Sequence, residues 1–173
     1  MIFEKKKMMQ YEAKQMLESV QDTYNHFAQQ WNTTRQHNWH EFVLSSKNIQ
    51  SGSTVLDLGC GNGRFYGFLE EKGINVQYHG VDNSKALIGI AKENYPEAAF
   101  EAGDALQLPY ADEYFDSVVS FAVLHHITPH SNRQQFCKEI ARVLKPGGSA
   151  FVTVWNIQQK KYRKHVREGF WFK

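Results

Sequence analysis

Residues 54–64 read TVLDLGCGNGR, and this stretch decides the fold. A short apolar run that ends in three glycines at alternate positions predicts a buried strand, Thr54–Leu58, followed by a tight turn. We expect the next helix over Arg64–Lys72, closed by Gly73, because glycine commonly ends a helix. A strand, a glycine turn and a helix in this order are typical of the first unit of a parallel α/β sheet.

The same alternation continues toward the C-terminus. Four further apolar strands are expected, at Val76–Val81, Ala98–Ala102, Phe115–Phe121 and Ala150–Trp155. Between them we expect one helix from a Ser84 cap to Asn94, a second helix after a Ser131 cap, and a turn at LKPGG, residues 144–148. The pattern predicts a doubly wound, Rossmann-like α/β sheet of five parallel strands, which binds ligands beyond the carboxyl ends of its strands.

The segment before the sheet has a different pattern. Apolar residues at spacings of three and four predict one helix over the first ~30 residues, with a stripe of Leu17, Val20, Tyr24, Phe27 and Trp31. A second short helix is expected over Trp39–Lys47. We therefore expect a helical arm or cap at 1–50, a core at 51–156 and a basic, aromatic tail at 157–173.

Composition excludes several classes of protein. Among 173 residues, 20 Lys and Arg oppose 18 Asp and Glu, so the chain is no polycation of the histone type. Its two cysteines, Cys60 and Cys137, predict neither a disulfide framework nor a zinc site, which favours a reducing compartment, the cytoplasm. The longest apolar runs fall far short of the roughly 20 residues that span a bilayer, so we expect no membrane association. We also expect no metal site from His125, His126 and His130, because adjacent side chains diverge and no thiolate joins them.

The glycine loop indicates the charge of its ligand. Asp57 lies two residues before Gly59, and Arg64 stands where a dinucleotide fingerprint has its last glycine. The carboxylate would repel a pyrophosphate and attract a cation, so a ligand with an ammonium and a sulfonium group fits better than NAD. A tight turn without any ligand is the alternative.

The segment DLGCGNGR resembles motif I of the class I S-adenosylmethionine (SAM) dependent methyltransferases. The resemblance implies SAM as cofactor, with Asp57 orienting its amino group, Asp82 on the ribose hydroxyls and Asp104 on the adenine amine. The cofactor-binding residues implied in this way are Asp57, Gly59, Cys60, Gly61, Gly63, Asp82, Asn83, Asp104, Ala105, Phe121 and Tyr24. That family has seven strands, so we expect its C-terminal hairpin strands to be missing here.

The loop after the fourth strand concerns the methyl acceptor. It lacks the proline motif of exocyclic-amine methyltransferases, and neither cysteine is placed to attack a pyrimidine. Residues 122–126, AVLHH, together with DTY at 22–24, Thr34-Arg35 and Val154-Trp155, resemble the tRNA wobble-uridine methyltransferases that esterify 5-carboxymethyluridine. The resemblance implies tRNA as partner, in eukaryotic members also a small activator protein, and Arg35 with one of His125 and His126 at the acceptor site.

A carboxylate acceptor makes modest chemical demands. Its pKa is about 4, so at neutral pH it is already a nucleophile and needs no general base. Arg35 is the candidate clamp, because a guanidinium holds a carboxylate with two hydrogen bonds. Three alternatives stay open: a solvated Arg35 with structural histidines, a methyltransferase of a small metabolite such as a quinone or carboxylic acid, and a SAM-binding fragment without catalysis.

Overall fold

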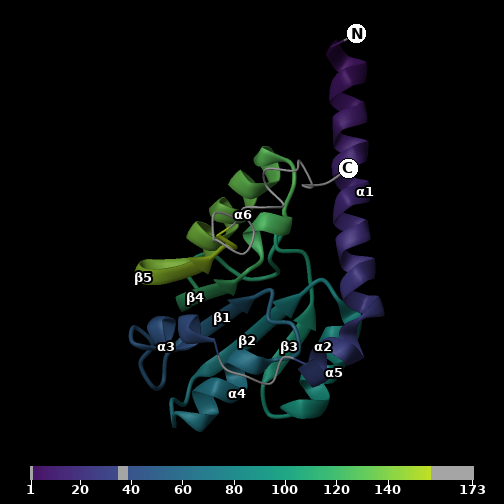
Figure 1. The fold of residues 1–173 in the computed structure, drawn as a ribbon. Helices are drawn as coiled ribbons and strands as arrows, with labels where there is room; N and C mark the ends of the chain where they lie inside the picture. Colours follow the sequence, from purple (N-terminus) through teal and green to yellow (C-terminus); the bar gives the residue numbers. More distant parts are fainter. Residues whose placement is uncertain (1, 35–38, 157–173) are drawn as a thin grey trace.

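The computed structural model of the chain describes residues 2–34 and 39–156. Within them one five-stranded sheet has the order β3-β2-β1-β4-β5, and all its neighbouring strands are parallel (Figure 1). The strands are β1 (Thr54–Leu58), β2 (Gln77–Asp82), β3 (Ala99–Ala102), β4 (Phe115–Phe121) and β5 (Leu144–Thr153). The prediction of a doubly wound α/β sheet with five parallel strands is confirmed.

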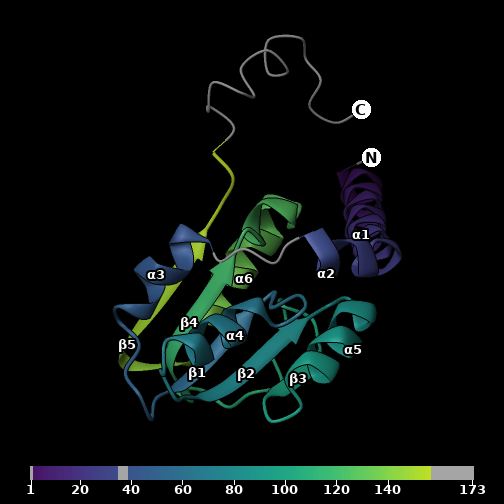
Figure 2. The same cartoon turned by 60° about the horizontal axis from the view of Figure 1, so that its bottom comes forward.

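Helices cover both faces of this sheet (Figure 2). They are α1 (Ile2–His26), α2 (Ala28–Thr34), α3 (His40–Ser46), α4 (Arg64–Glu71), α5 (Lys85–Asn94), the 3-10 turn η1 (Leu124–His126) and α6 (His130–Val143). Side chains of α3, α4 and α5 pack in one apolar cluster, and those of α6 pack in the cluster on the opposite face. None of these helices is both long enough and apolar enough to cross a membrane.

Strand β1 lies at the centre of the sheet and is buried along its whole length. Val55 belongs to the cluster of α3, α4 and α5, whereas Leu56 and Leu58 belong to the cluster of α6. Successive side chains of a strand point to opposite faces, which explains why a central strand of a covered parallel sheet is apolar throughout. Two residues of β1 are polar: Thr54 at its start, and Asp57, which is 2% exposed and lies one residue before the end of the strand.

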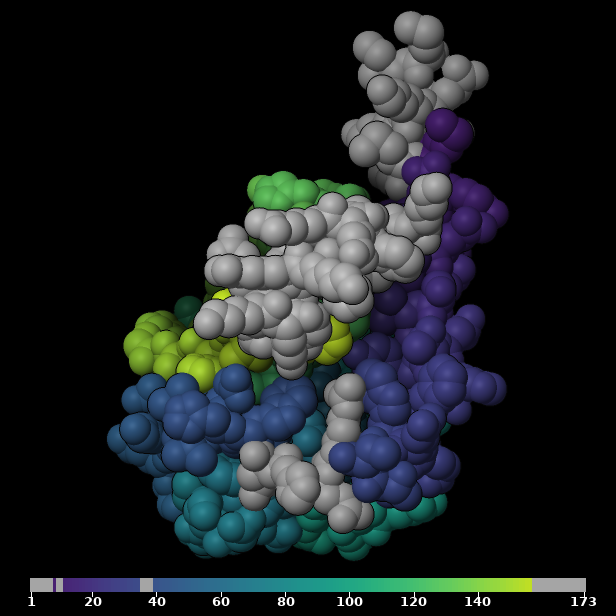
Figure 3. Space-filling view, viewed as in Figure 1, coloured from purple at the N-terminus to yellow at the C-terminus, as the bar shows by residue number. Residues whose placement is uncertain are grey.

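The N-terminal helix α1 reaches beyond the sheet and runs along one edge of the molecule (Figures 1 and 3). Its C-terminal part is tied to the start of α5 through polar side chains. Gln21 Nε2 donates to the carbonyl of Asn83 at 2.5 Å, and Ser84 Oγ donates to Asn25 Oδ1 at 2.7 Å. Ser84 also caps α5 as predicted, accepting a hydrogen bond from the amide of Leu87 at 3.2 Å. These contacts place the last turns of α1 over the carboxyl end of β2.

Three local predictions were wrong. In place of one helix over the first ~30 residues there are two, α1 and α2, which are separated at Phe27, a residue 42% exposed. Helix α6 starts at His130 after Pro129 and has no side-chain cap, so Ser131 is not the cap. The LKPGG segment is an irregularity inside β5, where Gly147 takes a φ of +81° and the pairing with β4 shifts, and β5 ends before Trp155.

Candidate functional site

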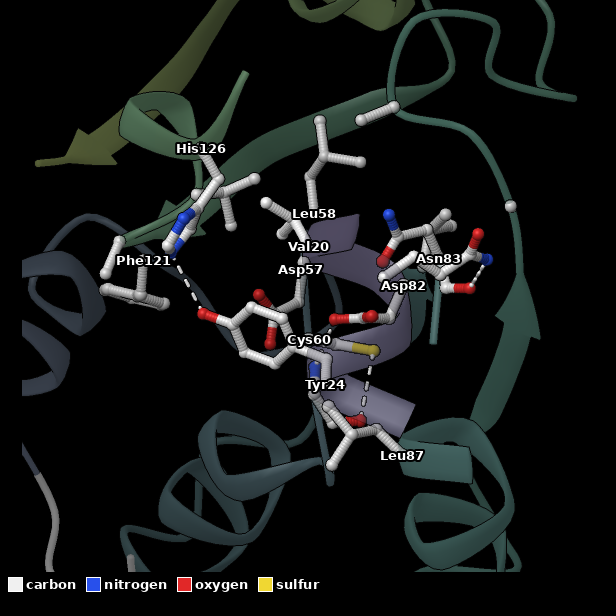
Figure 4. Close-up of a pocket in the computed structure, with 18 of the residues that line it drawn as sticks. Val20, Tyr24, Asp57, Leu58, Cys60, Asp82, Asn83, Leu87, Phe121 and His126 are labelled. Atoms are coloured by element: carbon white, nitrogen blue, oxygen red, sulfur yellow. Dashed lines mark hydrogen bonds between the residues drawn. The ribbon is translucent and has the colours of Figure 1, made fainter. Parts of the chain in front are cut away.

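A cavity of about 530 Å³ opens at the carboxyl ends of β1, β2 and β4. The glycine loop and the ends of these strands form one wall, and side chains of α1 and α2 form the other (Figure 4). The predicted site residues that line it are Tyr24, Asp57, Gly59, Cys60, Gly61, Asp82, Asn83, Asp104, Ala105, Phe121 and His126. Gly63 and His125 are not in the lining, and Arg35 lies outside the described residues.

The glycine loop has a backbone that other residues rarely adopt. Gly59 has a φ of +83°, and a Cβ built on it would lie 2.1 Å from Cγ2 of Val123. The amides of Gly59 and Cys60 both donate to the carbonyl of Val81, at 2.7 and 3.2 Å. The loop is therefore folded tightly onto β2. Gly63 has another role, because a Cβ there would lie 2.9 Å from the Phe100 ring, so this glycine lets the start of α4 pack closely against β3.

Asp57 is a buried carboxylate with one satisfied oxygen. The Tyr78 hydroxyl donates to its Oδ2 at 2.6 Å, whereas Oδ1 has no hydrogen-bond partner among the described residues. Burial raises the pKa of Asp57 to about 7, against the opposing effect of the Tyr78 hydrogen bond. A buried carboxylate that lacks one partner fits the ammonium group of an amino acid.

Asp82 connects the glycine loop to the following helix. Its Oδ2 accepts from the amide of Gly61 at 2.9 Å, and its Oδ1 accepts from the amide of Ser84 at 2.8 Å. Burial raises the pKa of Asp82, and these amide donors lower it. A carboxylate oxygen can accept two hydrogen bonds, so Asp82 keeps capacity for a hydroxyl pair. Asp104 is exposed and accepts from the amide of Leu106 at 2.8 Å.

The other end of the cavity is aromatic. The Tyr24 hydroxyl lies 2.9 Å from Nε2 of His126, and the Tyr24 ring packs edge-on against Trp31 at 4.3 Å between ring centroids. His125 is not in the lining, and its ring stacks on that of Trp155 at 5.0 Å between ring centroids. Burial lowers the pKa of His125, which favours a neutral imidazole. Of the adjacent histidines, His126 is thus the one that lines the cavity.

Sequence analysis missed two kinds of contributor. Tyr78 does not line the cavity but contacts Asp57 from behind. Arg64 lines the cavity, and its guanidinium carbon lies 4.6 Å from the ring centroid of Trp39, a cation–π contact. Arg64 could have been found from the sequence, because it ends the DLGCGNGR motif. Its contact with Trp39 could not, because it depends on how the segment before β1 packs against the sheet. Within residues 2–34 and 39–156, no group of three His, Cys, Asp or Glu side chains could hold a metal ion.

Comparison with known proteins agrees with this geometry. The profile of a family described as "Methyltransferase domain" matches residues 56–152. A tRNA (carboxymethyluridine(34)-5-O)-methyltransferase of Arabidopsis thaliana is 35% identical over 141 residues, which are 82% of this chain and 33% of that protein. The Saccharomyces cerevisiae protein of the same name is 31% identical over 152 residues, covering 88% of this chain and 53% of its own length. The chain thus spans about a third to half of these relatives.

Solved structures have the same architecture. A SAM-dependent methyltransferase of Methanosarcina mazei superimposes with a TM-score of 0.64 at 28% identity, covering 72% of this chain and 64% of that one. The complex of the Haloferax volcanii Trm112 methyltransferase activator with a protein described as a methyltransferase gives a TM-score of 0.70 at 25% identity. That match covers 84% of this chain and 66% of the other.

Proposed function

This chain belongs to the methyltransferase domain family, and we propose that it moves a methyl group from SAM to the carboxylate of 5-carboxymethyluridine at a tRNA wobble position. The observation that carries the proposal is the two-sided cavity. One end presents the buried carboxylate of Asp57, and the other presents Tyr24 and His126 among aromatic rings. Relatives named for this tRNA reaction match 82–88% of the chain.

We propose a role for each residue at the cofactor end in holding SAM. Asp57 would hold the ammonium group, the bare backbone of Gly59 and Gly61 would lie against the methionine part, and Asp82 would accept from the ribose hydroxyls. Asp104 and Ala105 would contact the adenine. The structural support is the unsatisfied Oδ1 of Asp57 and the positive φ of the glycines. SAM, when bound, supplies an electrophilic methyl group on a sulfonium.

At the acceptor end, the protein has to orient the acceptor carboxylate and to shield the reaction from water. An ionised carboxylate attacks without a general base, so the chain contributes alignment and exclusion of water. The hydrogen bond between Tyr24 and His126 fixes the imidazole against the cavity wall, and Trp31 packs behind the Tyr24 ring. Arg35 stays a prediction as the clamp of the acceptor carboxylate, because it lies outside the described residues.

The proposal extends to partners and compartment. We propose tRNA as the substrate, a small activator protein of the kind seen with the Haloferax neighbour as a further partner, and the cytoplasm as the compartment. A formal net charge of +2 neither favours nor opposes contact with RNA, so the RNA surface has to come from local groups. We propose the basic, aromatic tail at 157–173 as a source of such groups, and this tail lies outside the described residues.

The direct test is transfer to a defined tRNA. Purified chain, with and without an activator, is incubated with labelled SAM and tRNA bearing 5-carboxymethyluridine, and the digested nucleosides are identified by mass spectrometry. We expect the methyl ester at the wobble uridine. Binding of S-adenosylhomocysteine without any transfer to tRNA would contradict the proposed acceptor and direct attention to a small carboxylic acid or quinone.

Arg35 provides the matched variants. Arg35→Ala is expected to abolish transfer and to leave the affinity for S-adenosylhomocysteine unchanged, because the clamp contacts only the acceptor. Arg35→Lys keeps the charge but loses the two-pronged geometry and should recover only part of the activity. Gln36→Ala, the neutral neighbour in the chain, serves as control. An equal loss of cofactor binding in Arg35→Ala would refute the clamp.

A further inference from the structure

We propose that Tyr78, which does not line the cavity, is a positioning residue that commits one oxygen of Asp57 and keeps the other for the ammonium group of the cofactor. This inference rests on the proposed use of SAM. Tyr78 would act through Asp57 alone, and by favouring the charged carboxylate it would lower the pH above which the cofactor binds tightly.

The position of Tyr78 is fixed by packing. It lies in β2, is 4% exposed, and its ring contacts Tyr66 and Phe100 at centroid distances of 5.0 and 5.5 Å. β2 pairs with β1 in parallel, with Tyr78 beside Val55, so the phenol reaches along the strand to Asp57. Because packing fixes the Tyr78 ring, its hydroxyl can approach Asp57 from one direction only. It donates to Oδ2 at 2.6 Å, and Oδ1 has no hydrogen-bond partner among the described residues. Figure 4 shows the Asp57 carboxylate among the side chains that line the cavity.

Tyr78 is the only described side chain that hydrogen-bonds to Asp57. Asp82, at the end of β2, raises the pKa of Asp57, and Arg64, at the start of α4, lowers it. The thiol of Cys60 has a pKa well above its ordinary value because of burial, so it is uncharged. The further charged groups that line the cavity are Lys14 and Glu18 of α1, Lys85 of α5 and Asp104. The tyrosine hydroxyl is thus the direct contact that stabilises the charged carboxylate.

A consequence for binding follows from the pKa of about 7 that burial gives Asp57. Only the ionised carboxylate pairs with an ammonium, so affinity rises with pH through neutrality and binding near pH 7 releases a proton. Removing the Tyr78 hydroxyl raises the pKa of Asp57 further, because the hydrogen bond favours the charged form. A rise of about one unit would leave roughly one tenth of the carboxylate ionised at pH 7, against roughly half in the parent.

The test compares the parent with Tyr78→Phe by calorimetric titration with S-adenosylhomocysteine at pH 6, 7 and 8.5. We expect the variant to bind about tenfold more weakly at pH 6, about fivefold at pH 7, and within about 1.5-fold at pH 8.5. The ionisation of the ligand is the same for both proteins and cancels in this ratio. Tyr66→Phe removes a neighbouring hydroxyl that does not contact Asp57 and should bind like the parent at every pH. Titrations in buffers of different ionisation enthalpy count the released protons.

The outcomes separate this inference from the proposed function. A ratio of affinities that does not change with pH, or an equal effect of Tyr66→Phe, overturns the role of Tyr78 and leaves the use of SAM untouched. Failure of the parent to bind S-adenosylhomocysteine at any pH overturns the proposed cofactor itself. A ¹³C NMR titration of the Asp57 carboxyl without ligand must show a higher pKa in Tyr78→Phe, and an unchanged pKa also overturns the inference.

Discussion

Replacing Gly59 by alanine is expected to lower the free energy of unfolding by about 2–5 kcal/mol. Two costs add. A residue with a Cβ at a φ of +83° loses about 1–2 kcal/mol relative to glycine. The new Cβ would also lie 2.1 Å from Cγ2 of Val123, and overpacking of this kind costs about 1–3 kcal/mol. Because Val123 belongs to the loop before η1, the strain would also reach the histidine segment.

Two variants separate these costs. Gly61→Ala has a φ of +58° but no atom within 4 Å of the new Cβ, so we expect only the backbone cost of about 1–2 kcal/mol. In a Gly59→Ala background, Val123→Ala removes the clashing methyl group, since the next atom of Val123, its Cβ, lies at 3.3 Å. A double-mutant cycle should therefore show a favourable coupling of about 1–3 kcal/mol.

The assay is urea unfolding followed by far-ultraviolet circular dichroism, without ligand, for the parent and each variant. Equal losses for Gly59→Ala and Gly61→Ala would refute the close approach of the glycine loop to Val123. A double-mutant cycle with no coupling would also refute this close approach, because removing the Val123 methyl group should then relieve the clash with the new Cβ. A Gly59→Ala protein as stable as the parent would contradict the positive φ itself.

Three further predictions concern side chains around the cavity and the core. Asp82→Asn leaves one backbone amide without an acceptor and should lower the free energy of unfolding by about 1–3 kcal/mol, measured with urea. Tyr24→Phe removes the hydrogen bond to His126 and should lower kcat about tenfold with unchanged affinity for S-adenosylhomocysteine, measured by radiolabel transfer and calorimetry. The hydrogen bonds of Arg142 lower the pKa of Glu139, so their stabilisation is full above pH about 4.3 and is lost as pH falls through the folded pKa. Glu139→Gln should flatten this acid-side loss in thermal unfolding.

The sheet and the glycine loop were predictable because their signals are local. An apolar strand buried on both faces is a continuous run of residues, and the three glycines of 59–63 are required by backbone angles that the neighbouring sequence determines. The same holds for Ser84, whose capping bond to Leu87 spans three residues. Asp57 and Asp82 line one cavity because both lie at the carboxyl ends of β1 and β2, which are neighbouring parallel strands.

The features of the site that could not be predicted depend on contacts between segments that are distant in the sequence. The stripe of α1 was correctly predicted as helical, but its members Leu17, Val20 and Tyr24 line the cavity instead of a closed core. Periodicity identifies an apolar face and does not say what covers it. His125 and His126 are neighbours in sequence, and only the turn of η1 decides which one lines the cavity.

The close approach of Gly59 to Val123 links the two ends of the cavity. Val123 precedes η1 directly, and the amide of His126 donates to the Val123 carbonyl at 2.8 Å. The glycine loop can approach Val123 this closely only because Gly59 has no Cβ. Gly59, in the loop that we propose for cofactor binding, therefore also bears on the position of His126 and, through the hydrogen bond between the two side chains, on that of Tyr24. This double role belongs to Gly59 alone, because a Cβ on Gly61 would meet no atom within 4 Å and a Cβ on Gly63 would meet the Phe100 ring instead of Val123.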